Sequence, residues 1–561
     1  MKLTGFLFAA ALLGTCTQPA AEENYTRHVD PKIGTGGHGH VFVGANVPFG
    51  LVQVGPTSIP QTWDWCSGYH ASDSTVIGFS HTHLSGTGIG DLFDVTVMPV
   101  TGEVTYARGT EDDPTSGLWS YADRTQEIAR PGYYSVPLTR YGIRAELTAT
   151  ARVGLHRYTF PASDAAAVVF DLENGGCWDK ATETHLAKEG DRTVTGWRHS
   201  TGWAKDQRVY FTAEFSKPFK SLAIYEGGEG GGLREGDSFR AERLYGRVGF
   251  DTSAGETIYV KVAISPVSIE NARLNMQSEL PGWDFEATAA AADRAWDAEL
   301  QKVRIETSDD AARRIFYTAL YHAFLLPRSI SENGRYRSPY NGQVCEGESF
   351  TDYSTWDTFR ALHPLLVLLK PDLASHMVTG LLNGYDEGGW MPKWPNPGYT
   401  NCMMGTHSDA IIADAYVKGV RGFDEKKAAE AMLKNANVKG NHIAWGRLGI
   451  EDYNSLGYVP VDHYRESVAR TMEFAYDDWC LARFFEAKGD TEKAREYDLR
   501  SQRFKNVLDA ETKLVRARRS DGTWAAPSDY NISVWSGFNE TGALNYRKNY
   551  TLFAPHDVPA L

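Results

Sequence analysis

The hydrophobic period of this chain changes once, near Pro281, and the change divides the sequence into two unlike halves. Before it, apolar and polar residues alternate along short runs such as 208–215 and 259–264, with turn residues between the runs. Such alternation is typical of half-buried antiparallel strands. After it, apolar residues recur every three or four positions, as in 466–488, which is typical of helices with one buried face. The sequence therefore predicts a β-rich half followed by an α-helical half.

These halves are long enough to be separate domains, because 561 residues exceed what one hydrophobic core usually supports. We predict an antiparallel β-sandwich over 22–275, a helical linker over 276–303 and a domain of paired helices over 304–561. The apolar spacing predicts helices over 285–303, 310–326, 355–369, 404–419, 425–436, 466–488 and 492–508. Gly489 is the expected stop of the sixth helix, and Asp490 can cap the seventh. Short loops between successive predicted helices favour a helical hairpin array or toroid. The glycine-rich segment 226–232 precedes no predicted helix, so we interpret it as a hairpin tip rather than a phosphate-binding loop.

The first 21 residues have the pattern of an export signal. Met1 and Lys2 precede a mostly apolar run over 3–13, which is too short to span a bilayer. The segment Leu13-Gly-Thr-Cys16 resembles a bacterial lipobox, in which Cys16 becomes the lipidated first residue. Ordinary cleavage within 18–21 is the alternative. We expect an exported protein of a Gram-negative bacterium, in the periplasm or lipid-anchored at the outer membrane or cell surface, with no transmembrane segment.

Charge and composition exclude several classes of partner. The net charge of −14 argues against nucleic acids and anionic membranes, which both reward clustered lysine and arginine. Aromatic residues make up 12% of the chain, which favours glycans or else a β-rich core that uses many aromatic residues. Five cysteines follow Cys16 without a Cys-x-x-Cys spacing, so a zinc knuckle is not indicated, and the sequence cannot pair them into disulfides.

Tryptophans stand beside carboxylates in the middle of the chain. Trp356 and Asp357 lie at the start of a predicted helix, and Trp390, Lys393 and Trp394 follow about thirty residues later. Indole rings offer flat apolar faces to the C–H side of a sugar, while carboxylates accept hydrogen bonds from its hydroxyls. This combination predicts a carbohydrate site.

Asp357 also has a structural interpretation. The segment Ser354-Thr-Trp-Asp357 fits a capping box, in which the acid at the third helical position hydrogen-bonds a free backbone N–H. A cap alone does not require Trp356 beside the acid or Arg360 one helical turn later, so we favour the ligand-binding interpretation.

A second aromatic and acidic cluster lies in the β-rich half, at Trp63, Asp64 and Trp65. These tryptophans could stack on a sugar or fill the edge of the sandwich. Two histidine pairs lie nearby in sequence, at 38 and 40 and at 81 and 83. Each pair would share a face of an extended segment and could bind zinc. We favour the alternative that they hydrogen-bond turned backbone and ligand hydroxyls.

Near the C-terminus, Glu540 lies among glycine, asparagine and tyrosine residues. Its setting suits a general acid, and the alternative is an ordinary surface glutamate.

Several long motifs together resemble glycoside hydrolase family 92, the calcium-dependent exo-acting α-mannosidases of bacteria. The similar segments run in one order from about Val29 to the end of the chain. They include Ile33-Gly-Thr-Gly-Gly-His-Gly-His40, Gly78-Phe-Ser-His-Thr-His-Leu-Ser-Gly-Thr-Gly88, Trp356-Asp-Thr-Phe-Arg-Ala-Leu-His-Pro364, Ala475-Tyr-Asp-Asp-Trp-Cys480 and Ala554-Pro-His-Asp-Val558. The resemblance implies a β-sandwich, linking helices and an (α/α)6-type toroid. It implies mannose-containing glycans as substrates, Asp357 as a sugar-binding residue and Glu540 as the general acid of an inverting reaction.

The sequence also departs from the family pattern. Leu544 replaces an expected tryptophan, and about four extra residues precede the Pro-His-Asp motif. The motif similar to Gly-Asn-Asp-x-Gly-Gln-Met-Ser-Ala-Trp, which carries the family's general base, does not occur, nor does one similar to Asn-Glu-Pro…His. We therefore expect an incomplete toroid, a missing base and some missing calcium ligands. The alternative function is a non-catalytic glycan-binding lipoprotein or an inactive remnant.

Overall fold

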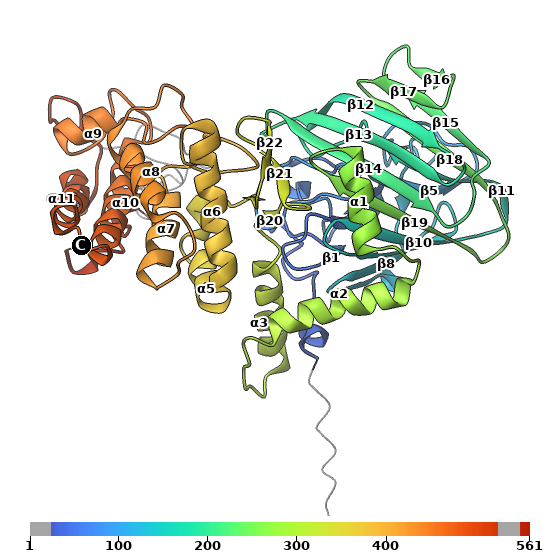
Figure 1. Cartoon of the computed structure of the whole chain (residues 1–561), viewed down its shortest axis with the longest axis horizontal. Helices are drawn as coiled ribbons and strands as arrows, with labels where there is room; N and C mark the ends of the chain where they lie inside the picture. The colour runs from blue at the N-terminus through green and yellow to red at the C-terminus, as the bar shows by residue number, and fades with distance from the viewer. Residues whose placement is uncertain (1–23, 526–549, 561) are drawn as a thin grey trace, which may run out of the picture.

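A computed structural model describes residues 24–525 and 550–560, and it contains the two predicted halves (Figure 1). The sandwich lies on the right of the view and the helices lie on the left, with short strands between them. None of the helices in these described ranges is both long and apolar enough to cross a membrane.

The β-rich half contains two large antiparallel sheets. One has eight strands and the other has nine. The eight-stranded sheet runs in the order β1 (Ala45–Asn46), β2 (Gln53–Thr57), β4 (Gly78–Ser80), β5 (Thr96–Thr101), β11 (Ser163–Asp171), β18 (Leu244–Thr252), β15 (Ser221–Glu226) and β16 (Gly232–Arg234). The nine-stranded sheet runs in the order β17 (Ser238–Ala241), β12 (Lys180–Glu189), β13 (Thr193–Thr201), β14 (Gln207–Phe215), β19 (Glu256–Ser265), β10 (Val153–Phe160), β9 (Ile143–Ala149), β8 (Tyr133–Leu138) and β7 (Ile128–Arg130).

Both sheets contribute to one apolar core, which confirms the predicted sandwich. Phe170 of the first sheet stacks on Phe211 of the second, with ring centroids 5.5 Å apart. Alternation places such residues inside because successive side chains of a strand point to opposite faces. Residues 226–232 connect β15 to its antiparallel partner β16, where Glu226 pairs with Gly232, so this segment is the predicted hairpin tip.

Two helices cover the outer face of the nine-stranded sheet. They are α1 (Ile269–Glu279) and α2 (Phe285–Leu300), and Figure 1 shows both against the sandwich. Met276 and Phe285 from these helices pack with Val153 and Leu155 of β10. The predicted sandwich limit at residue 275 therefore falls inside α1. The predicted linker helix begins at Phe285, as the sequence pattern indicated, and Asp284 caps it by accepting from the N–H of Ala287.

The second half is mostly helical, again as predicted. Its helices are α3 (Asp310–Ala323), α4 (Thr355–Thr358), α5 (Leu362–Leu369), α6 (Pro371–Gly388), α7 (Ser408–Val417), α8 (Glu425–Asn437), α9 (Ile450–Leu456), α10 (Ser467–Ala487) and α11 (Thr491–Ser501). The predicted stop and start between the last two are present: Gly489 adopts a left-handed φ of 80°, and Asp490 accepts from the N–H of Lys493.

Helix α10 lies at the centre of this half and is buried nearly all round its circumference. It contacts α7 and α11, and its apolar residues join the large helical core. Its buried face also contains charged residues, at Glu473, Asp477 and Asp478. A helix of this kind requires buried charge partners, and these lie next to the candidate site.

Short strand pairs lie outside the two large sheets. They are β20 (Arg328–Ser329) with β23 (Phe350–Thr351), β21 (Arg335–Arg337) with β22 (Val344–Glu346), β3 (Thr75–Val76) with β6 (Ser120–Tyr121), and β24 (Leu508–Asp509) with β25 (Leu514–Val515). In Figure 1, β20, β21 and β22 lie between the sandwich and α6.

Candidate active site

Loops of the sandwich meet the helical half at a small apolar cluster, which we call the junction cluster. The sandwich supplies the loop 84–92 and Trp203, and the helical half supplies the segments around positions 356, 394 and 402. The members of the junction cluster are Leu84, Ile89, Leu92, Trp394 and Cys402, with Trp203, Trp356 and Met403 partly buried against them. Two of the predicted site tryptophans, Trp356 and Trp394, therefore lie at the junction of the two halves.

Asp357 lies next to this cluster and opens to solvent. The indole N–H of Trp394 donates to its Oδ2 at 3.3 Å. Its side chain is exposed, yet burial by the surrounding protein raises the pKa of the carboxyl, against the opposing effects of Trp394, Arg360 and His407. A carboxyl that water reaches but protein surrounds lies in a concavity. It can accept hydrogen bonds from a ligand there.

The capping-box interpretation of this segment is wrong. Ser354 adopts a left-handed backbone conformation, with φ 47° and ψ 52°, and its side chain makes no capping hydrogen bond. A residue at the N-cap usually has extended backbone and accepts from the second or third helical N–H. The predicted helix over 355–369 is also interrupted, because Ala361 separates α4 from α5 with a non-helical ψ/φ pair. Asp357 is thus left free for a ligand.

Trp356 is fixed by polar contacts on its far side. Its indole N–H donates to Oε1 of Glu473 at 2.9 Å, and the Arg360 guanidinium lies 4.4 Å from its ring centroid. The hydroxyl of Tyr550 donates to the same oxygen of Glu473 at 2.8 Å. Glu473 is fully buried, so these contacts hold the indole in one orientation.

A buried charge network supports Glu473. His407 places Nε2 2.9 Å from a Glu473 oxygen and Nδ1 2.9 Å from an Asp477 oxygen. Although burial opposes it, the two carboxylates raise the pKa of His407 to about 9, so the ring carries a charge at neutral pH. The ring nitrogens of His407 make no well-aligned hydrogen bond to these oxygens, so charge attraction is the main interaction between them. Phe359 stacks on the imidazolium with ring centroids 4.1 Å apart.

The network continues into the helical core. Arg447 contacts Asp478 at 2.6 Å and Asp409 at 3.3 Å, and all three side chains are fully buried. Asp478 also accepts from Arg500. The predicted helix pattern of 466–488 could have revealed this network, because Glu473 and Asp477 are four residues apart and share one helix face with apolar neighbours.

The predicted cluster in the sandwich reaches the same junction. The indole N–H of Trp63 donates to the carbonyl of Gly88 at 3.1 Å, next to Ile89 of the junction cluster. A Cβ at position 88 would lie 2.5 Å from that indole nitrogen, so this contact needs glycine. Asp64 pairs with Nδ1 of His38 at 2.5 Å and is half-buried. Gly88 therefore brings the Trp63 region next to the junction cluster.

Other predicted residues take supporting positions. The indole N–H of Trp65 donates to Asp73, away from the junction. Trp390 is buried between Trp445 and the ammonium group of Lys434, which lies 4.5 Å from its ring. Lys393 is 3% exposed and donates to Asn401 at 2.9 Å. Burial lowers the pKa of Lys393 to about 7. Neither Trp390 nor Lys393 presents a free face, because nearness in sequence does not set side-chain direction.

The buried histidines at 81 and 83 contact other protein groups. His81 contacts the carbonyl of Val95 at 2.6 Å and His156 at 2.9 Å, and His83 contacts the carbonyl of Gln53 at 2.7 Å. Within residues 24–525 and 550–560, no three histidine, cysteine, aspartate or glutamate side chains are placed to hold a metal ion. Glu540 lies outside the described residues.

A β-sandwich joined to a helical domain, with tryptophans and a carboxyl at the junction, has the layout of a glycoside hydrolase. Comparison with known proteins identifies the family. The glycosyl hydrolase family 92 N-terminal domain matches residues 28–265, and the family 92 catalytic domain matches residues 271–561. The chain belongs to glycoside hydrolase family 92.

Solved structures of this family are similar along nearly the whole chain. A family GH92 α-mannosidase of Bacteroides thetaiotaomicron, in complex with mannoimidazole, is 35% identical with a TM-score of 0.89, over 95% of this chain and 71% of that chain. An inverting mannosidase of the same family and species is 31% identical with a TM-score of 0.84, over 92% of this chain and 69% of that chain. An uncharacterized secreted glycosidase of Arthroderma benhamiae is 25% identical, over 96% of this chain and 72% of its own length.

The charged state of His407 gives the first testable prediction. Because its pKa is raised in the folded protein, its contribution to stability is complete below pH 6.5 and is lost as the pH rises through about 9. The substitution His407→Gln removes one partner of a buried ion pair and should lower the free energy of unfolding by about 3–5 kcal/mol at pH 6. The difference from wild type should shrink by pH 9.5, as measured by urea unfolding.

The free energy of unfolding must be compared between wild type and variant at each pH, because Lys393 changes the stability of both proteins with pH in the opposite direction to His407. With its pKa lowered to about 7, Lys393 adds stability as the pH rises towards its ordinary value. His376→Gln is the matched control, since His376 is exposed on α6. A His407→Gln effect that stays constant from pH 6 to pH 9.5 would show that the ring is neutral in the folded protein.

Proposed function

We propose that this protein is an exo-acting inverting α-mannosidase that removes terminal α-linked mannose from N-glycans or mannan. The observation that carries the proposal is the solvent-reached carboxyl of Asp357, hydrogen-bonded to Trp394 and flanked by Trp356 at the junction of the halves. This carboxyl and these indoles supply the acceptor and the apolar faces that a terminal sugar needs. Family membership and the likeness to an inverting mannosidase support the reaction class.

In this mechanism the chain's own residues bind and orient the sugar, and one acid supplies a proton. Asp357 accepts from hydroxyls of the terminal mannose, while Trp63, Asp64 and Trp356 border the ring. Trp394 holds Asp357 in place through its indole N–H, whereas Trp65, Trp390 and Lys393 pack within the surrounding protein. Glu540 acts as the general acid and donates its proton to the leaving oxygen. In inverting enzymes a carboxylate activates water on the opposite face, with about 6.5–9.5 Å between the two carboxyls.

The general base belongs to a motif that these 561 residues do not contain. We therefore place hydrolysis in a polypeptide that carries both groups, and the relevant experiment compares the product of the open reading frame that encodes these residues with the 561-residue chain. Binding of mannosides by both proteins, with turnover by neither, would favour the non-catalytic glycan-binding protein instead.

Export is part of the proposal. The apolar segment 3–13 and the lipobox-like sequence at Cys16 lie outside the described residues, and their pattern supports a periplasmic or lipid-anchored protein of a Gram-negative bacterium. The similar fungal protein is described as secreted, which agrees with export of this chain.

The role of Asp357 is tested by Asp357→Asn. Loss of a charged acceptor should cost about 1.5–3 kcal/mol of transition-state binding, or roughly a 10- to 150-fold fall in kcat/KM on an α-mannoside. Asp386→Asn is the matched control, because Asp386 is an exposed carboxyl that pairs with Lys427 on the surface. Equal activity of the two variants would remove Asp357 from the site.

The role of Glu540 is tested by Glu540→Gln in the protein that turns over α-mannosides. Removing the proton donor should lower kcat by about 10²–10⁴-fold, since that is the typical contribution of general acid catalysis. Mannoside binding, measured by calorimetry, should be unchanged. Glu511→Gln serves as the control, because Glu511 is exposed in the same C-terminal part of the chain. Unchanged turnover in Glu540→Gln would assign the proton to another group.

Calcium dependence is implied by the family. Calcium takes carboxylate, carbonyl and water oxygens as ligands. Treatment of the active protein with EDTA should therefore abolish turnover, and added calcium should restore it. Full activity after EDTA treatment and exhaustive dialysis would contradict this part of the proposal. Magnesium at the same concentration is the control for a nonspecific divalent effect, because it demands smaller, more regular octahedral coordination.

A further inference from the structure

A cavity of about 400 Å³ lies between the two halves. Trp203 and Trp394 separate it from Asp357. The sandwich supplies one side through residues 203–209, and the helical half supplies the other through β20, β21 and the segment 397–400. Trp203 lines the cavity, and its ring lies 6.2 Å from the ring of Trp394, which in turn donates to Asp357. Asp357, Trp356 and Trp394 are not among the lining residues, so the cavity and the Asp357 concavity are neighbours that share a wall.

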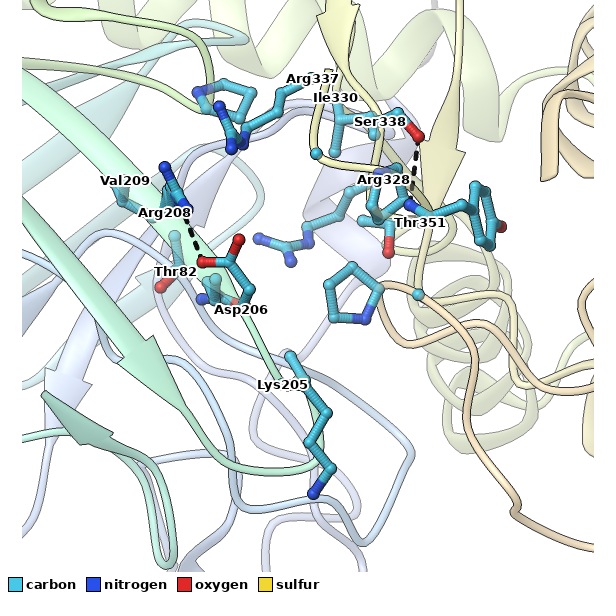
Figure 2. A pocket seen from close by; sticks show the side chains of 18 of the residues that line it. Thr82, Lys205, Asp206, Arg208, Val209, Arg328, Ile330, Arg337, Ser338 and Thr351 are labelled. Carbon is cyan, nitrogen blue, oxygen red and sulfur yellow. Dashed lines mark hydrogen bonds and ion pairs between the residues drawn. The ribbon is translucent and has the colours of Figure 1, made fainter. Parts of the chain in front are cut away.

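Four cationic side chains line this cavity. They are Lys205 and Arg208 from the sandwich, and Arg328 and Arg337 from the helical half. Figure 2 shows the guanidinium of Arg328 near the middle of the lining, with Arg208 and Arg337 on one side and Lys205 on another. The lining contains one acidic residue, Asp206. A cavity with this balance favours an anion over a neutral or cationic ligand.

Protein carboxylates neutralise only part of this charge. Arg208 pairs with Asp206 at 2.9 Å, and the buried Arg328 donates to Asp352 at 2.6 Å. Lys205 and Arg337 have no carboxylate within ion-pair distance in residues 24–525 and 550–560. Arg337 is half-buried, and its guanidinium makes no hydrogen bond within those ranges. Its charge also helps to lower the pKa of Asp206, after the larger effect of Arg208 and against burial.

The Arg337 guanidinium has no carboxylate partner in residues 24–525 and 550–560, and it lines the cavity where a ligand can reach it. Arginine offers a planar set of donors that matches the oxygens of a carboxylate or phosphate. The volume is larger than an inorganic anion needs and lies within the range of small-molecule sites. Aromatic rings at Trp203, Tyr340 and Tyr399 also line the cavity. Such rings suit the apolar face of a sugar.

We propose that this interdomain cavity binds a sugar that carries a carboxylate or phosphate group. The negative charge of that group pairs with the side chains of Arg337 and Lys205. The anionic group bridges the sandwich and the helical half, because its cationic partners come from both. The binding site itself does not depend on catalysis.

The test is calorimetric binding to the purified protein at low ionic strength. Four probes separate the sources of the signal: D-glucuronate, D-glucose 6-phosphate, inorganic phosphate and neutral D-glucose. We expect at least one of the two sugar anions to bind at least tenfold more tightly than inorganic phosphate and neutral glucose. Raising the salt concentration should weaken this binding, because mobile ions screen the exposed lysine.

Variants then locate the binding. Arg337→Gln and, separately, Lys205→Gln should each weaken binding of the sugar anion at least tenfold. Arg335→Gln is the matched control, since Arg335 is an exposed arginine two residues away on β21 and does not line the cavity. Thermal melting of all three variants checks that they fold. If Arg337→Gln does not fold, Lys205→Gln still tests the proposal, because Lys205 is exposed.

Three results would overturn the proposal. The first is no binding of either sugar anion, and the second is equal binding of inorganic phosphate and the sugar phosphate. The third is undiminished binding in Lys205→Gln and in any folded Arg337→Gln. None of these measurements uses turnover, so failure here leaves the α-mannosidase proposal standing. Conversely, a protein that binds sugar anions at this cavity but does not hydrolyse α-mannosides would support the cavity proposal and contradict the α-mannosidase proposal.

Discussion

A charged imidazole buried between two carboxylates organises the helical half around the candidate site. His407 contacts Glu473 and Asp477 on neighbouring turns of α10, and Glu473 in turn fixes the indole of Trp356. Removing one member of such a network leaves an uncompensated charge in a medium of low dielectric, which is why these groups act together. The orientation of Trp356 beside Asp357 therefore depends on an interaction two contacts away from any ligand.

The two halves depend on each other at the junction cluster. The sandwich contributes a glycine-rich loop in which Gly88 allows Trp63 to approach, and the helical half contributes Trp356 and Trp394. This shared construction explains why the apolar cluster, the concavity and the cationic cavity all lie along one boundary.

Much of the fold could be predicted from the sequence, because the hydrophobic period reports which faces are buried. The sandwich, its hairpin at 226–232, the linker helix from Phe285 and the stop at Gly489 follow from local patterns. The interruption at Ala361 could not be predicted, since the apolar spacing of 355–369 continues across it. Helix α6 was also missed, although Pro371 at its first turn is a typical start.

The site was harder to predict than the fold. Asp357, Trp356 and Trp394 meet as their composition indicated, but Trp390 and Lys393 turn into the helical core. Sequence distance cannot report side-chain direction in an irregular segment such as 389–400. The network of His407 and the cationic cavity escaped prediction for a related reason: their members come from segments far apart in the chain, and only the tertiary fold brings them together.

The account rests on a mannose-sized ligand occupying the concavity beside Asp357. The most direct measurement is a crystal structure of the protein with mannoimidazole. We predict density for the sugar between Trp356 and the loop around Trp63, with a carboxyl oxygen of Asp357 within hydrogen-bonding distance of its hydroxyls. Density for the ligand elsewhere, with Asp357 bonded only to Trp394, would contradict the account.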